Sequence, residues 1–155
     1  MNAKPALPLP ARIRPGVAGD IAALLAIEQA SFDSDRLSRR SFRHLLTEGN
    51  SVTLIDEGDG VPRAYITLLF RADVSLARIY SIATAPAWLG QGLAAGLLEA
   101  AEALALAHNC VAMRLEIRRD NIASQQLFCA TVTRSSASTR LTTKMAWMPC
   151  AWKNR

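Results

Sequence analysis

The fold of this chain is decided by the stretch Ser81-Ile-Ala-Thr-Ala-Pro-Ala-Trp-Leu-Gly-Gln-Gly-Leu-Ala-Ala95. It begins inside a β-rich run, Leu76–Thr84, that Pro86 closes, and it ends inside a helix predicted from about Gln91 to Ala107. Where a helix begins, its first backbone N–H groups are unpaired and the positive end of its dipole points outward. Glycines in the preceding turn let a ligand approach the backbone closely. The stretch therefore predicts a phosphate-binding turn, with a simple tight turn as the plainer interpretation.

The same residues also fit a dinucleotide-binding fold. Gly90, Gly92 and Ala95 match its fingerprint Gly-x-Gly-x-x-Gly/Ala, and Glu116 stands where an acid that binds the ribose is expected. In that fold, however, the fingerprint follows the first strand, and several more β-α units come after it. Here several strand-like runs precede the glycines, and little chain follows Asn121. A dinucleotide-binding protein is therefore the more distant alternative.

Outward from this stretch, hydrophobic periodicity predicts the remaining elements. Upstream it indicates a short strand, two helices and two more strands: Arg12–Arg14, a helix opened by Asp20, Ser38–Glu48, Ser51–Ile55 and Ala64–Phe70, with turn-rich residues 56–60 between the last two. Downstream, Val111–Arg118 alternates as a strand with one polar face, and Asn121–Phe128 suits a short helix. This order predicts one mixed α/β domain with a mostly antiparallel central sheet, flanking helices and a late β-α-β crossover.

Two blocks of the sequence carry a family resemblance. The stretch from Ser81 to Ala94 resembles the acetyl-CoA-binding segment of the GCN5-related N-acetyltransferase (GNAT) family, Ile-Ala-Val-x-Pro and then Arg/Gln-x-x-Gly-x-Gly/Ala, although Leu89 replaces the Arg or Gln. Downstream, Leu115-Glu-Ile-Arg118, Asn121 and the pair ending in Phe128 resemble the family's Leu-Glu-Val-Arg, Asn and Leu-Tyr block. The resemblance covers residues 12–128 and is strongest to the branch that acetylates the N-terminal alanine of a ribosomal protein. It implies the GNAT acyl-CoA N-acyltransferase fold.

The resemblance also implies a reaction and a set of site residues. Acetyl-CoA would donate its acetyl group to a primary amine, most simply a protein N-terminal α-amine, by direct attack. The cofactor would be held by the backbone of Ile82, Ala83 and Thr84 at the pantetheine arm, by Gly90, Gln91, Gly92, Leu93, Ala94 and Ala95 at the pyrophosphate, and by Asn121. Glu116 would act as the general base, since a protonated amine cannot attack. Its alternative role is an ion pair with Arg114 or Arg118.

Two departures from the family pattern motivate a second functional hypothesis. The family's Tyr, which reprotonates the leaving thiolate, is Phe128 here, and a phenyl ring cannot donate a proton. Leu89 is the other departure. Together with an altered chain ending, they favour a catalytically impaired acyl-CoA-binding module as the alternative to an active enzyme.

The altered ending is visible in the charges. The chain has 155 residues and a net charge of +5, but residues 129–155 hold five basic and no acidic residues, and residues 1–128 are balanced. A neutral body gives no reason to expect a nucleic-acid partner. The family's last two strands and its Asp-Gly-x-Asp-Ala segment are missing from this tail, so we expect the fold without those strands.

A shifted reading frame is our hypothesis for the origin of this tail. When the third base of each codon is joined to the first two of the next, the junctions Met145-Ala146, Trp147-Met148 and Met148-Pro149 must encode Gly, Asp and Ala, in the order Gly-x-Asp-Ala. We therefore interpret residues 129–155 as an atypical basic tail that a frameshift near Cys129, natural or from sequencing, produced. Its segments Thr131–Arg134 and Thr139–Trp147 keep β-propensity for an imitation hairpin.

The remaining features predict a cytoplasmic single-domain protein. Residues 1–11 lack the unbroken apolar region of a secretion signal and are expected to be a disordered tail before a domain over 12–128. Uncharged runs end well before membrane-spanning length. Three widely spaced cysteines suggest neither a disulfide framework nor a structural metal, so no metal or membrane partner is expected. Tyr80 and Trp88 flank the cofactor segment Ile82–Thr84, and we expect both to pack in the core.

Overall fold

The computed structural model describes residues 10–31, 37–47, 50–71, 74–110, 112–115 and 142–145. Its elements in chain order are β1 (Ile13–Pro15), a 3-10 turn (Ala18–Asp20), α1 (Ile21–Ser31), α2 (Arg39–Thr47), β2 (Ser51–Gly58), β3 (Val61–Arg71), β4 (Val74–Thr84), a 3-10 turn (Pro86–Trp88), α3 (Leu93–Ala107), β5 (Ala112–Leu115) and β6 (Thr142–Met145).

The strands form one sheet in the order β1-β2-β3-β4-β5-β6. The first three pairings are antiparallel, and the pairings of β4 with β5 and of β5 with β6 are parallel. Helix α3 makes the crossover between β4 and β5. The predicted mixed, mostly antiparallel sheet is therefore confirmed. Its antiparallel half does not fit the dinucleotide-binding alternative, which needs a parallel sheet throughout.

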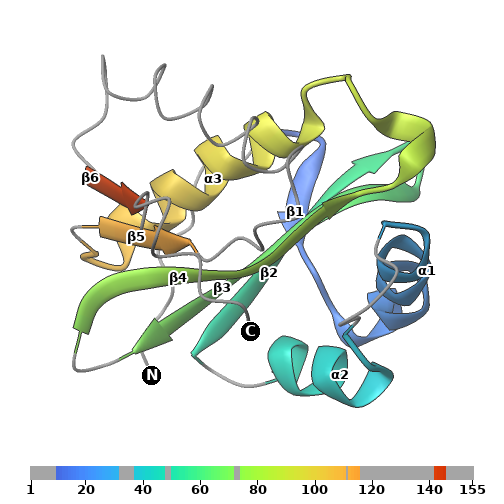
Figure 1. Cartoon of the computed structure of the whole chain (residues 1–155). Helices are drawn as coiled ribbons and strands as arrows, with labels where there is room; N and C mark the ends of the chain where they lie inside the picture. The colour runs from blue at the N-terminus through green and yellow to red at the C-terminus, as the bar shows by residue number, and fades with distance from the viewer. Residues whose placement is uncertain are drawn as a thin grey trace.

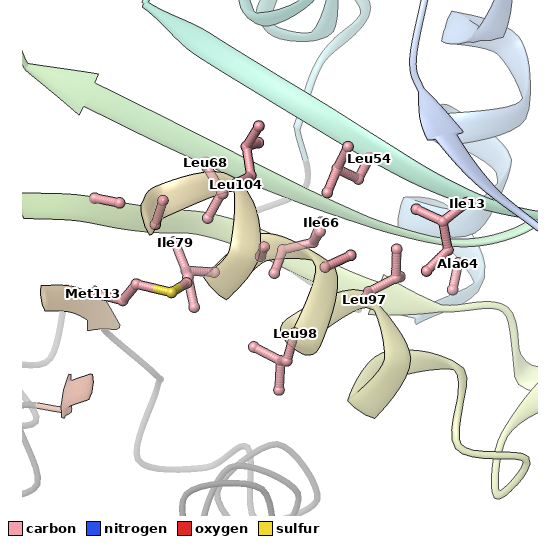
Figure 2. Close-up of a cluster of buried hydrophobic side chains, with 14 of the residues drawn as sticks. Ile13, Leu54, Ala64, Ile66, Leu68, Ile79, Leu97, Leu98, Leu104 and Met113 are labelled. Atoms are coloured by element: carbon pink, nitrogen blue, oxygen red, sulfur yellow. The ribbon is translucent and has the colours of Figure 1, made fainter. Parts of the chain in front are cut away.

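The sheet separates two hydrophobic cores, with α3 on one face and α1 and α2 on the other (Figure 1). Side chains alternate along a strand, so Leu54 and Ile66 belong to the α3 core while Ile55 and Tyr65 belong to the opposite one. Figure 2 shows the α3 core, in which Leu97 and Leu104 of the helix lie beside the aliphatic side chains of the sheet. The two faces of the sheet are therefore packed separately.

The hairpin between β2 and β3 is tighter than the sequence predicted. Both strands run further than expected, so only Asp59 and Gly60 form the turn, with φ angles of 53° and 78°. An Asp-Gly pair with two positive φ angles is the preferred two-residue hairpin connection because its twist matches that of the strands. Asp56 and Glu57 consequently lie in β2, with a bulge between them.

The C-terminal part of the sheet is described only in short segments. Strand β5 falls within the predicted strand Val111–Arg118, whereas residues 116–118 and the predicted helix Asn121–Phe128 lie outside the described residues. Strand β6 falls within Thr139–Trp147 and pairs in parallel with β5. The other segment of the predicted imitation hairpin, Thr131–Arg134, lies outside the described residues, so that hairpin stays a prediction. Residues 1–9, and all of the tail except 142–145, also lie outside the described residues.

Within the described ranges, no helix combines the length and the apolar character that crossing a membrane would require.

Candidate functional site

In the part of the chain that the structure describes, the end of β4 is paired along one edge only, and its other edge is called the open edge below. Its pairing with β3 continues to Thr84, but its pairing with β5 covers only Leu76–Ile79. Among the described residues, Tyr80–Thr84 therefore has no strand neighbour on the β5 side. Backbone N–H and C=O groups on an open edge are available to an extended ligand. Ile82, Ala83 and Thr84, predicted to bind the cofactor through their backbone, lie on this edge.

A β-bulge marks the start of the open edge. Leu68 of β3 pairs with Ile79 and Thr67 pairs with Ser81, so Tyr80 is an extra residue with no partner opposite it. Its side chain is 43% exposed. The prediction that Tyr80 packs in the core was wrong, because the bulge turns it out of the sheet's regular alternation.

The bulge also changes which face the rest of β4 presents. Before it, Ala77 and Ile79 belong to the α3 core. After it, Ala83 belongs to the α1–α2 core, and Ser81 hydrogen-bonds to residues on that face. If β4 alternated regularly through Tyr80, these four side chains would share one face. These side chains of β4 thus pack in the α3 core before Tyr80 and on the opposite face after it.

The glycine turn has the backbone that the sequence predicted for it. Gly90 and Gly92 have φ angles of 79° and 77°, and a Cβ at either position would meet no heavy atom within 4 Å. Both glycines are required by the left-handed backbone, and the space above them is open to a ligand. Trp88, which precedes the turn, is partly buried against the α3 core, as expected.

Helix α3 begins at Leu93, two residues later than predicted, because Gly92 is its left-handed N-cap. The N–H of Gly96 makes the first helical bond, to the carbonyl of Gly92 at 3.1 Å. The N–H groups of Leu93, Ala94 and Ala95 precede that bond and so have no carbonyl within the helix. Gly92 has no side chain to cap them, and the first turn contains no acidic residue. This end of α3 suits an anion.

A cluster of two arginines and one aspartate lies beside the same end of α3. Asp56 is fully buried on the α3 face, opposite Ala64 of β3. Arg63 Nη2 lies 2.6 Å from Asp56 Oδ1, and Arg12 Nε lies 3.2 Å from Oδ2. The Arg63 guanidinium also lies over the Trp88 ring, 5.3 Å from its centroid. Two guanidinium groups share one carboxylate, so the cluster has excess positive charge.

The guanidinium group of Arg12 lies against the first turn of α3. A Cβ at Gly96 would come within 2.6 Å of Arg12 Nη2, so the missing side chain makes room for the guanidinium. The Arg12 side chain is 47% exposed and can reach a ligand. Leu89, which stands where the family prefers Arg or Gln, is 64% exposed and cannot supply a charge. Sequence reasoning missed Arg12, because only the strand register brings it to α3.

These observations fit a ligand with an extended arm and a diphosphate. The open edge of β4 suits the arm, and the turn Gly90–Gly92, the free amides of α3 and the excess positive charge suit the phosphates. Among the described residues, no group of three or more His, Cys, Asp or Glu side chains could hold a metal ion.

A sequence model of the Acetyltransferase (GNAT) family matches residues 21–130. The chain belongs to this family. It therefore has an acetyl-CoA-dependent N-acetyltransferase domain, and the GNAT fold predicted from the two sequence blocks is confirmed. The match also excludes the dinucleotide-binding alternative. No curated protein sequence matches the chain.

Solved structures show the same fold at low sequence identity. Ribosomal-protein-S18-alanine N-acetyltransferase from Escherichia coli is 22% identical, with a TM-score of 0.69 over 76% of this chain and 74% of that one. The PaiA N-acetyltransferase of Thermoplasma acidophilum, in complex with coenzyme A, is 16% identical, with a TM-score of 0.70 over 76% and 86%. Diaminobutyrate acetyltransferase EctA from Paenibacillus lautus, in complex with its substrate and coenzyme A, is 20% identical, with a TM-score of 0.70 over 80% and 75%.

The described residues contain only part of the predicted site. Those at the cofactor segments are placed together around the end of β4 and the start of α3. Glu116 and Asn121 lie outside the described residues, as does Phe128, so the predicted base and the last cofactor contact stay predictions. The residue before Glu116, Leu115, is paired with Ile79, immediately before the bulge.

Proposed function

We propose that this N-acetyltransferase transfers the acetyl group of acetyl-CoA to the N-terminal α-amine of a protein, with Glu116 as the general base. The observation that carries the proposal is the open edge of β4 leading to the turn Gly90–Gly92 at the start of α3. The acceptor class is supported by the resemblance of the sequence to the branch that acetylates a ribosomal protein.

The layout of the donor follows from the two ends of this edge. The diphosphate lies at the glycine turn and the amides of α3, where positive charge gathers. The pantetheine arm then runs back along β4 from Thr84 toward Tyr80, a strand length of about 13 Å. The thioester is thereby brought to the bulge at Tyr80.

The acceptor must lose a proton before it can react. A terminal α-amine has a pKa near 8 and is mostly protonated at neutral pH. The amine nitrogen forms a bond to the thioester carbonyl carbon, the carbon–sulfur bond breaks, and coenzyme A leaves as the thiolate. Glu116 takes the amine proton, and its position in sequence directly after Leu115 supports this role, because Leu115 pairs beside the bulge.

Acetyl-CoA titration followed by a thiol-release assay tests the proposal. The acceptor is a peptide that begins with alanine, and its control is the same peptide with a blocked N-terminus and an internal lysine. We expect thiol release with the free N-terminus only, and a loss of at least a hundredfold in kcat for Glu116→Gln with unchanged acetyl-CoA affinity. Equal release with the blocked peptide would contradict the acceptor, and full activity of Glu116→Gln would contradict the base.

A second candidate function is an acyl-CoA-binding module with impaired catalysis. The exposed Leu89 and the replacement of the family's Tyr by Phe128 favour it. It predicts that acetyl-CoA binds while no peptide or small amine releases the thiol. The tail 129–155 enters here as well, because we propose that it replaces strands on the acceptor side. An intact mass equal to that of the printed sequence would eliminate the sequencing-error origin of the tail and leave the natural frameshift.

A further inference from the structure

A buried carboxylate lies under the open end of β4, on the face opposite α3. Glu28 of α1 is 1% exposed. Its Oε1 accepts hydrogen bonds from the hydroxyl of Tyr65 and, at 3.3 Å, from Ser81 Oγ. Its Oε2 accepts the backbone N–H of Leu37 at 2.8 Å. The Tyr65 and Ser81 hydroxyls are themselves 2.8 Å apart.

This arrangement holds a negative charge against neutral partners. Glu28 is the acceptor in each of these hydrogen bonds, which is the pattern of an ionised carboxylate. All three of these donors are uncharged groups. Burial, together with the charge of Glu28, raises the pKa of Tyr65, so the phenol keeps its proton and continues to donate it. Among the described residues Glu28 has no cationic partner, and a buried charge that is hydrogen-bonded without such a partner attracts a cation.

The network reaches the reacting end of the proposed donor site through Ser81. This residue is partly exposed and lies between the bulge residue Tyr80 and the edge residues Ile82–Thr84. Helix α1 is also tied to the other end of that edge, because Ser31 Oγ donates to the carbonyl of Thr84 at 3.1 Å. The helix that carries Glu28 is therefore fixed against the segment along which the pantetheine arm is expected to lie.

We propose that Ser81, supported by Tyr65 and Glu28, binds the acceptor amine in its ammonium form and positions the nitrogen beside the bulge. While its own hydrogen is donated into the network, the Ser81 oxygen has a lone pair that accepts an N–H of the ammonium. The charge of Glu28 stabilises the cation through Ser81 and Tyr65. The inference rests on the proposed function, in which Glu116 removes the proton, and it makes Ser81 a positioning residue for cationic amines.

Calorimetric titration of a peptide that begins with alanine into the full chain saturated with coenzyme A tests this inference. We expect Ser81→Ala and Glu28→Gln to weaken peptide binding about tenfold, the effect of losing one charge-assisted hydrogen bond. The affinity for coenzyme A should stay within about twofold, since neither change touches the proposed donor contacts. The same peptide with an acetylated N-terminus has no ammonium, and we expect it to bind all variants equally weakly.

Thr67→Val is the matched control. Thr67 is paired with Ser81 across β3 and β4, is fully buried, and bonds to Thr53 Oγ1 at 2.9 Å instead of to the Glu28 network. Its replacement removes a buried hydroxyl on the same face, and peptide affinity should not change. Equal losses of peptide affinity in Thr67→Val and Ser81→Ala would mean that the network has only a structural role, and would overturn the inference. Ser81→Ala keeps the test valid if Glu28→Gln fails to fold, because Ser81 is partly exposed.

Thiol release separates this inference from the proposed function. A wild-type chain that binds the peptide only with a free N-terminus, loses that binding in Ser81→Ala and releases no thiol supports the amine site and contradicts the catalytic proposal. A chain that releases thiol with unchanged KM for the peptide in Ser81→Ala and Glu28→Gln supports catalysis and contradicts the amine site. The absence of any peptide binding by the wild-type chain also overturns the inference.

Discussion

Two buried carboxylates, Asp56 and Glu28, lie on opposite faces of the same sheet and are satisfied in opposite ways. Asp56 is shared by two guanidinium groups, Arg12 and Arg63, so its surroundings have excess positive charge. In the part of the chain that the structure describes, Glu28 is held by two hydroxyls and a backbone N–H, so these surroundings have excess negative charge. The comparison teaches that burial alone does not define the electrostatic role of a carboxylate. The partners define it, and here they suit an anionic donor on one side and a cationic acceptor on the other.

The largest expected difference between the two sites is in stability. Asp56→Asn leaves two arginines without their buried counter-charge, and we expect it to lower the free energy of unfolding by about 3 kcal/mol. Glu28→Gln keeps a polar group among neutral donors and should cost only about 1–2 kcal/mol. Denaturant unfolding of both variants measures the difference. Equal losses would mean that Glu28 is as strongly coupled to charge as Asp56.

The next largest effect is expected from a change at the glycine turn, which should weaken the binding of acetyl-CoA. In Gly92→Ala the residue must keep a left-handed backbone, which costs about 1–2 kcal/mol, and its methyl group enters the space proposed for the diphosphate. Gly60→Ala is the matched control, since Gly60 has a φ of 78° with open space around it in the β2–β3 hairpin. We expect similar losses of stability in both variants. A loss of acetyl-CoA affinity of more than about tenfold should appear only in Gly92→Ala.

A smaller effect is expected at the exposed arginine of the Asp56 cluster. Arg12→Gln should weaken acetyl-CoA binding about fivefold to tenfold and leave the binding of acetyl-pantetheine, which lacks the diphosphate, unchanged. Arg14→Gln, two residues along the chain, serves as the control because Arg14 hydrogen-bonds to Asp20 and Glu57. Competition titrations with both ligands measure the ratio of the affinity for acetyl-CoA to the affinity for acetyl-pantetheine. Equal weakening of both ligands by Arg12→Gln would point to a structural role.

The smallest expected effect is the pH dependence of the Arg14 contacts. Hydrogen bonding to Arg14 lowers the pKa of Asp20 and of Glu57 below their ordinary values. Because the folded-state values are depressed, this stabilisation is present above about pH 4 and is lost as the pH falls further. The difference in Tm between wild type and Arg14→Gln should therefore shrink from pH 6 to pH 3. A difference that stays constant over this range would contradict the assignment.

The sequence predicted the elements better than the contacts between them. The β-rich run Ser51–Ile55 and the glycines at 90 and 92 were enough for a strand of the sheet and for the turn, since local composition and turn chemistry determine both. The bulge at Tyr80 was missed because no single residue type specifies it. The Arg12–Asp56 contact was missed because its partners are far apart in sequence and meet only through the strand register. Glu28 was missed because it stands in a largely apolar helix without a nearby motif.

The bulge at Tyr80 has a consequence for changes in chain length. Every side chain of β4 after it is out of phase with those before it. Deleting Tyr80 would remove the bulge and make Ile79 and Ser81 neighbours in a regular strand, so Ser81 would stay on the face opposite α3. Deleting a single residue between Leu76 and Ile79 would instead shift the side chains on one side of that position to the opposite face. Position 80 can therefore change its residue, or lose it, without exchanging the two faces of β4.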